Sequence, residues 1–160
     1  MLFFLVAVGE IAAAQQSFGA EQPLKNRTTI PTSVLSDLRK EIDLKSAGCT
    51  HSKLGEALEA ANVNLGSQNK TILLKPAPGA WCLCGAYLCP AWIYELTSSG
   101  SKQIWRADGM SIVNILEKKN DGVRQIQSVG GSAGHGFEAL WKWDGEKYKS
   151  AGDKYWSSRP

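Results

Sequence analysis

The stretch from Trp81 to Tyr94 reads Trp81-Cys-Leu-Cys-Gly-Ala-Tyr-Leu-Cys-Pro-Ala-Trp-Ile-Tyr94, and it contains three of the four cysteines and two of the six tryptophans in this chain of 160 residues. Pro90 can begin a strand, because the first position of a strand tolerates the missing N–H of proline. Successive side chains of a strand point to opposite faces. One face would carry Trp92, Tyr94 and Leu96, and the other Ala91 and Ile93. Both faces are apolar, so the pattern predicts a strand that is covered on both sides.

The cysteine count predicts two disulfides, formed by Cys49, Cys82, Cys84 and Cys89. Cys82 and Cys84 are separated by one residue and would point to the same face of a strand, where they are poorly placed to bond each other. The preferred pairing is Cys84–Cys89 with Cys49–Cys82, because the first bond closes a tight turn and the second ties a helix end to the sheet. The pairing Cys82–Cys89 with Cys49–Cys84 remains open.

The pattern ahead of this stretch is helical. The segment Pro31-Thr-Ser-Val-Leu-Ser-Asp-Leu-Arg-Lys-Glu-Ile42 carries apolar side chains on one face at helical spacing, namely Val34, Leu35, Leu38 and Ile42. A shorter second helix is predicted over residues 52–61, although Gly55 lowers its helix propensity.

Short apolar runs alternate with turns in the rest of the chain, which is typical of antiparallel strands joined in a meander. Besides the strand after Pro90, strands are predicted at 71–74, 103–106, 111–117, 123–129, 137–143 and 147–149. Pairs of the type Asp-Gly, which favour hairpin turns, occur at Asp108–Gly109, Asp121–Gly122 and Asp144–Gly145. The sequence therefore predicts an α+β fold, with one or two N-terminal helices packed on a mainly antiparallel, meandering and disulfide-stapled β-sheet of about five to seven strands.

The clearest hairpin is Leu140-Trp-Lys-Trp-Asp-Gly-Glu-Lys-Tyr148, in which two strands flank a two-residue turn. It resembles the hairpins of FG-GAP-type and related secreted bacterial β-proteins. The layout of residues 31 to 150 also resembles uncharacterised exported bacterial proteins, in which a short helix precedes a lone Cys, a Cys-Gly…Cys-Pro-x-Trp strand and a hairpin meander. The resemblance implies a fold and no activity. The calcium loop D-x-D-x-D-G of FG-GAP blades is absent, because neither Asp108 nor Asp144 follows a second acid at that spacing.

The N-terminus has the pattern of a secretory signal peptide. A short apolar run from Leu2 to Val8 precedes Ala12-Ala-Ala14, which offers an A-x-A cleavage site. We therefore expect residues 1–14 to be a signal peptide, residues 15–30 an extended N-terminal arm, and residues 31–160 a single α+β domain. Export would place the cysteines in an oxidising compartment, so a periplasmic or secreted protein is expected.

Composition and spacing exclude several functional classes. Lysine and arginine number 18 against 15 acidic residues and are scattered along the chain, so there is no basic stripe for a nucleic acid. The apolar run at the N-terminus is too short to span a bilayer, and no membrane span is expected in the mature chain. The C-x-C-x4-C spacing of the cysteines is uncommon for zinc sites. We expect neither a metal nor a cofactor.

Tryptophans that are exposed on a sheet would point to carbohydrate binding. Trp141 and Trp143 share one face of their predicted strand with Phe137 and Ala139. Because large aromatic side chains mainly bury, this face is predicted to be core.

Catalysis by a nucleophile needs a base in a fixed geometry, and the two histidines of the chain are His51 and His135. His135 and Ser132 lie in Gly130-Gly-Ser-Ala-Gly-His-Gly136, which is predicted to be an exposed and mobile connection. We therefore expect a non-enzymatic exported binding or inhibitory protein that contacts a protein or an envelope glycan through Ser132 and His135. The alternatives are a small exported hydrolase that uses His135 or His51, and a structural β-module of the cell envelope.

Overall fold

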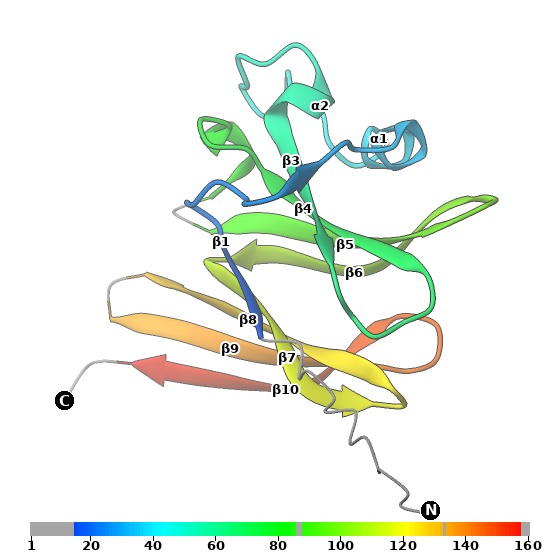
Figure 1. The fold of residues 1–160 in the computed structure, drawn as a ribbon. Coiled ribbons are helices and arrows are strands. Elements are labelled where there is room, and N and C mark those ends of the chain that lie inside the picture. Colours follow the sequence, from blue (N-terminus) through cyan, green and yellow to red (C-terminus); the bar gives the residue numbers. More distant parts are fainter. Residues whose placement is uncertain (1–14, 86–87, 133, 158–160) are drawn as a thin grey trace, which may run out of the picture.

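The computed structural model describes residues 15–85, 88–132 and 134–157, so the expected signal peptide lies outside the described residues. Within these ranges the chain forms two five-stranded antiparallel sheets that stack face to face (Figure 1). Sheet A has the strand order β1 (Gln16–Gly19), β7 (Ile112–Asn120), β8 (Val123–Ser132), β9 (His135–Trp143) and β10 (Tyr148–Ser157). Sheet B has the order β2 (Arg27–Thr28), β3 (Leu58–Val63), β4 (Lys70–Pro76), β5 (Cys89–Thr97) and β6 (Gly100–Met110).

Two apolar cores hold these layers together. The larger core lies between the sheets and includes Ile93 and Trp105 from sheet B and Val113 and Ile126 from sheet A. The smaller core lies on the other face of sheet B, where α1 (Thr32–Leu38) and α2 (Leu54–Ala57) pack (Figure 1). Strand β5 lies between β4 and β6 in sheet B and contributes to both cores, which confirms the prediction of a strand that is covered on both sides.

The fold prediction is confirmed in part. The described chain is mostly antiparallel β-structure with short helices, but it has two sheets where the sequence predicts one meandering sheet. The second predicted helix is wrong beyond Ala57, because Leu58–Val63 is a strand that pairs with both β2 and β4. Leu58 faces the helices while Ala61 faces the other sheet, so burial on two faces overrides the helix propensity of this alanine-rich segment. No described helix has the length and apolar character needed to cross a membrane.

The three Asp-Gly pairs behave differently. Asp121–Gly122 forms the tight β7–β8 turn with positive φ at both residues, as predicted. The β9–β10 hairpin is confirmed, but the Asp144 carboxylate accepts the N–H groups of Glu146 and Lys147, which puts Gly145 and Glu146 at the tip. Asp108–Gly109 makes no turn, because both residues lie inside β6.

Both disulfides of the preferred pairing are present in the structure. Cys84–Cys89 closes a tight turn in which Gly85 and Leu88 exchange two backbone hydrogen bonds of 2.8 and 2.7 Å. Cys49–Cys82 links the segment after α1 to the short 3-10 helix Trp81–Leu83. Closing this 33-residue separation stabilises the fold by about 3 to 4 kcal/mol, mainly by restricting the unfolded chain.

The sequence predicts an extended arm over residues 15–30, but the N-terminal segment, residues 16–28, forms two short strands separated by bends and is part of both sheets. Its first strand, β1, pairs with β7 at one edge of sheet A, and its second, β2, pairs with β3 at one edge of sheet B. Between them, Ala20 and Leu24 are buried in the core that the two sheets share. The segment therefore crosses from one sheet to the other at the edge of the stack.

A buried ion pair fixes the middle of the N-terminal segment. Lys75 and Glu59 lie opposite each other on β4 and β3, and Lys75 Nζ lies 2.7 Å from Glu59 Oε1. The Lys75 ammonium also donates to the Ala20 carbonyl at 3.2 Å, and the Glu59 carboxylate accepts the Leu24 N–H at 2.9 Å. Arg27 adds an ion pair to the other carboxylate oxygen at 3.2 Å, without hydrogen-bond geometry. The pair is thus bonded to the segment that covers it.

Replacing Lys75 with methionine is expected to lower the free energy of unfolding by about 3 to 5 kcal/mol, because it removes the buried cation of the Glu59 carboxylate and leaves only the exposed Arg27 beside it. Urea unfolding measures the change. Lys70→Met is the matched control, since Lys70 is exposed at the start of the same strand, and it should change stability by less than about 0.5 kcal/mol. Equal stabilities of the two variants would show that the buried pair does not support the fold.

Stability should also fall at alkaline pH through Tyr148. Burial raises the pKa of this phenol, whose hydroxyl donates to the Arg124 carbonyl at 2.6 Å. The unfolded chain releases the proton near pH 10, so the contribution of Tyr148 is complete below about pH 10 and is lost as the pH rises beyond it. Urea unfolding between about pH 8 and 11 should give a shallower decline for Tyr148→Phe than for the unchanged protein. Parallel declines would contradict this role.

Candidate functional site

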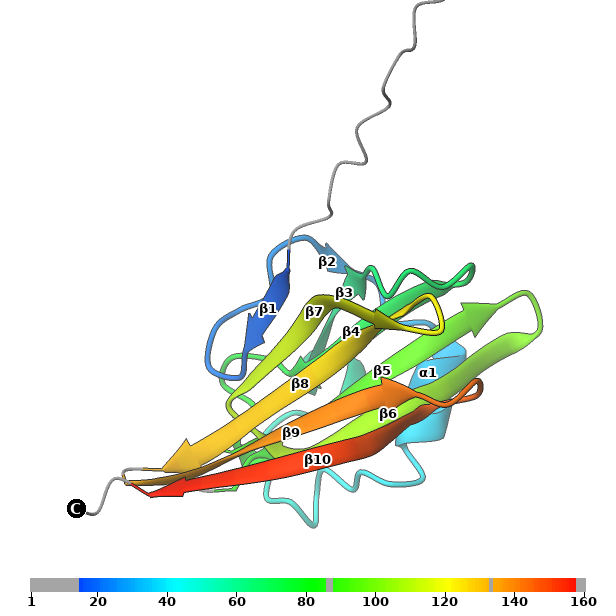
Figure 2. The same ribbon diagram turned by 90° about the horizontal axis from the view of Figure 1, so that it is seen from below.

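The face of sheet A that points away from sheet B is not covered by any described element (Figure 2). The strand register places glycine and polar side chains on much of this outer face, together with four apolar ones. Across its five strands the face carries Ser17, Gly19, Ile112, Asn114, Gln127, Val129, Gly131, Gly136, Glu138, Leu140 and Trp156.

Two glycines make room for the indole ring of Trp156 on this face. Gly131 of β8 pairs with Gly136 of β9, which pairs in turn with Trp156 of β10. A Cβ atom on Gly136 would overlap the indole ring, and one on Gly131 would lie 3.4 Å from its Cζ2 atom. The ring therefore lies against a floor of glycine backbone, and the Trp156 side chain remains 49% exposed.

A shallow hollow of about 530 Å³ continues from Gly131 toward the N-terminal segment. Its walls come from β1 and the residues after it on one side and from the start of β7 on the other. The lining residues are Ser17, Gly19, Ala20, Glu21, Gln22, Ser111, Ile112 and Gly131. Because Gly131 lines the hollow and also contacts Trp156, the exposed ring and the hollow form one continuous surface.

A row of hydrogen bonds crosses the outer face beside this surface. The Asn114 amide donates to Gln127 Oε1 at 2.7 Å, and the Gln127 amide donates to Glu138 Oε1 at 2.7 Å. The three side chains come from β7, β8 and β9, so the row fixes their orientation across three strands. Side chains that are held in this way offer their remaining donors and acceptors in fixed directions.

Both predicted binding residues, Ser132 and His135, are exposed, and they pair with each other at the end of the β8–β9 hairpin. The connection is much shorter than the predicted stretch from Gly130 to Gly136, because β8 continues to Ser132 and β9 begins at His135. Strand β10 lies alongside, with Trp156 opposite Gly136. Ser132 and His135 therefore lie at the border of the Trp156 surface, next to its glycine floor.

The histidines do not assemble a catalytic group in the part of the chain that the structure describes. His135 lies on sheet A, whereas His51 lies between the helices on the far side of sheet B, and its Nδ1 atom is buried. The hydrogen bonds and ion pairs found among the described residues join neither histidine to a hydroxyl or a carboxylate. The same residues contain no cluster of three or more His, Cys, Asp or Glu side chains that could hold a metal ion.

Trp141 and Trp143 pack against the core between the sheets, as predicted. The Trp141 ring meets Trp105 edge to face at a centroid distance of 5.9 Å, and its Nε1 donates to Ser128. The exposed aromatic residues on sheet A are instead Tyr155 and Trp156.

The sequence prediction missed Tyr155 and Trp156 because it ended the last strand at residue 149. Two signals could have extended it. Aromatic residues favour strands, and a partner for the nine-residue strand β9 has to be of similar length. The sequence prediction also missed the walls that β1 supplies, because a short polar segment with prolines is usually predicted to be a loop.

Comparison of the chain with protein-family models, with curated proteins and with solved structures finds no match. The outer face of sheet A, with Trp156, the glycine floor and the adjoining hollow, is the candidate site on geometry alone.

Proposed function

We propose that this protein is an exported, non-enzymatic binding protein that holds a glycan on the outer face of sheet A. The observation that carries the proposal is the half-exposed indole ring of Trp156, held on the backbone of Gly131 and Gly136 beside an open hollow. A tryptophan that served only to fill the core would be buried, whereas Trp156 is half-exposed. Here the fold uses two glycines to seat the ring at the surface.

The chemistry of this surface suits a sugar chain. The apolar C–H face of a pyranose ring packs on an aromatic ring, and its hydroxyl groups both donate and accept hydrogen bonds. The row of Asn114, Gln127 and Glu138 offers hydrogen-bond donors and acceptors, from amide and carboxylate groups, in fixed positions. The uncovered sheet and the hollow provide an extended bed rather than a deep pocket, which suits a polymer.

Export is supported by the two disulfides, because such bonds persist in oxidising compartments and are rare in the cytosol. A periplasmic or secreted location would bring the protein to envelope or extracellular glycans. A binding role is favoured over the hydrolase alternative because hydrolysis needs a base held against its reacting partner, and neither His51 nor His135 is held in that way among the described residues.

Trp156→Ala should weaken binding to the glycan about tenfold or more, since about 1.4 kcal/mol of ring contact corresponds to a factor of ten. Affinity electrophoresis in gels that contain soluble peptidoglycan fragments, chitosan or β-glucan measures the change. Trp81→Ala is the matched control, because Trp81 is 47% exposed but lies on the 3-10 helix beside sheet B, and it should bind like the unchanged protein.

Gly136→Ala displaces the Trp156 ring without removing it, because the added methyl group occupies the position of the ring. It should reduce retardation in the same gels, whereas Gly85→Ala, whose added methyl group meets nothing within 4 Å, should not. Retardation that is unchanged in both Trp156→Ala and Gly136→Ala, or absent for every glycan tested, would contradict the proposal.

A further inference from the structure

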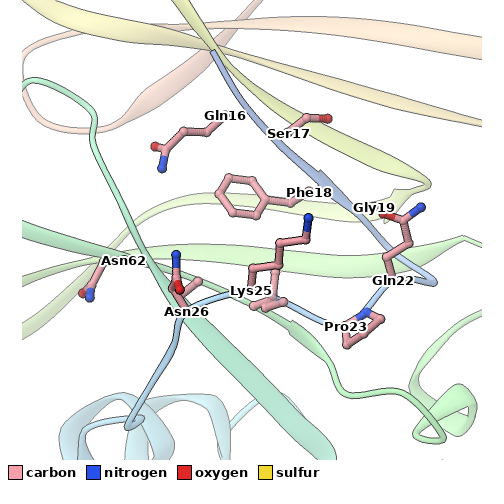
Figure 3. Close-up of a pocket in the computed structure, with 11 residues that line it drawn as sticks. Gln16, Ser17, Phe18, Gly19, Gln22, Pro23, Lys25, Asn26 and Asn62 are labelled. Atoms are coloured by element: carbon pink, nitrogen blue, oxygen red, sulfur yellow. The ribbon is translucent and has the colours of Figure 1, made fainter. Parts of the chain in front are cut away.

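A second hollow opens on the other side of β1, at the edge where the two sheets part (Figure 3). It has a volume of about 300 Å³ and lies between β1, the residues that follow it and β3. Ligand pockets usually measure about 300 to 1,000 Å³, so this one suits a single small molecule. None of its lining residues is Trp156, Ile112 or Gly131, and what it binds is independent of the function proposed for the outer face.

Four side chains face this pocket from two directions. Figure 3 shows the ring of Phe18 at its centre with the Lys25 side chain beside it, and the amide groups of Gln16 and Asn26 on the opposite side of the ring from Lys25. Gln16 and Phe18 belong to β1, whereas Lys25 and Asn26 come from the turn that leads into β2. Phe18 is partly buried against the core between the sheets, so its ring forms a firm apolar wall.

The polar groups of the pocket have unused bonding capacity. Gln16 Oε1 accepts the N–H of Asn64 at 2.9 Å, which fixes the amide and leaves its NH2 group to donate. Among the described residues, the side chains of Lys25 and Asn26 make no hydrogen bond and no ion pair with another residue. Lys25 is the only charged residue among the eleven that line the pocket.

The walls are held in place by the buried ion pair beneath them. Lys75 bonds the Ala20 carbonyl, Glu59 bonds the Leu24 N–H, and the Ala20 N–H donates to the Ser111 carbonyl at 2.8 Å. Asn26 itself has a φ of 53°, in the left-handed region that asparagine tolerates. The pocket is thus preorganised, which lowers the entropic cost of binding a ligand.

We propose that this pocket binds a single acidic sugar residue, a hexuronate. The Phe18 ring would pack against the C–H face of the pyranose. The Gln16 NH2 group would donate to a hydroxyl group, and the Asn26 amide would both donate and accept. The carboxylate would lie at the Lys25 ammonium, where a charge-assisted hydrogen bond is stronger than a neutral one. A neutral sugar would leave that cation unpaired, and a simple carboxylate would leave the ring and the amides unused.

The test is a titration of the ¹⁵N-labelled protein, residues 15–160, with glucuronate, glucose or acetate, followed through the side-chain amide signals of Gln16 and Asn26. Glucuronate should shift both signals at millimolar concentration, glucose should bind about tenfold more weakly, and acetate should leave the Gln16 signal unchanged. Lys25→Gln should lower the glucuronate affinity about tenfold and remove its advantage over glucose. Lys70→Gln, which removes an exposed lysine that does not line the pocket, should have no effect.

Asn26→Gly keeps the left-handed backbone conformation and removes the amide, and it should also weaken glucuronate binding. Trp156→Ala should bind glucuronate like the unchanged protein, so failure of the outer-face proposal would not affect this result. Equal shifts with glucose and glucuronate, equal shifts with acetate, or no shift of either amide signal would each overturn the proposal.

Discussion

The ion pair between Lys75 and Glu59 fixes the N-terminal segment to sheet B, and the rest of the structure depends on this contact. Both side chains are almost fully buried, at 0% and 2% exposed, and ions in such a place are stable only when further hydrogen bonds satisfy them. Those bonds come from the N-terminal segment, through the Ala20 carbonyl and the Leu24 N–H. Sheet B supplies the charges and the segment supplies the groups that solvate them. Neither is complete alone, and this explains why a short polar stretch of chain is packed across the edge of both sheets.

The position of the N-terminal segment determines where the hollows of the molecule lie. One hollow lies between β1 with the residues after it and the start of β7, and the other between β1 and β3. Ser17, Gly19 and Gln22 line both of them. The same backbone thus forms a wall for a flat polymer bed on one side and for a small pocket on the other. Binding groups commonly sit on segments that a rigid scaffold positions, and here the scaffold is the ion pair with the two sheets.

The sequence predicts much of the fold because local rules dominate there. The alternation of Ala91, Trp92, Ile93 and Tyr94 identifies the strand that is covered on both faces, the spacing of the cysteines favours the pairing that forms, and Asp121–Gly122 makes its hairpin turn. The sequence prediction fails where tertiary contacts determine the structure. The stretch after Ala57 has helix propensity but is buried on two faces, and Lys75 looks like an ordinary surface lysine in sequence. Of the candidate site, the predicted residues Ser132 and His135 lie near the surface that Trp156 dominates. Trp156 and the walls from β1 depend on strand pairings between distant segments, for which the aromatic residues 155 and 156 are the main local signal.

Hydrogen–deuterium exchange of the backbone amides in the N-terminal segment tests most directly whether this segment is a fixed part of the fold. The Ala20 and Leu24 amides both donate to groups outside the segment, Ser111 O and Glu59 Oε1, so they should exchange as slowly as the amides of the interior strand β5. Lys75→Met should speed their exchange more than that of β8. Exchange of Ala20 and Leu24 at the rate of an unfolded chain, while β5 stays protected, would show that the segment is a loose arm and that the walls of both hollows are not fixed.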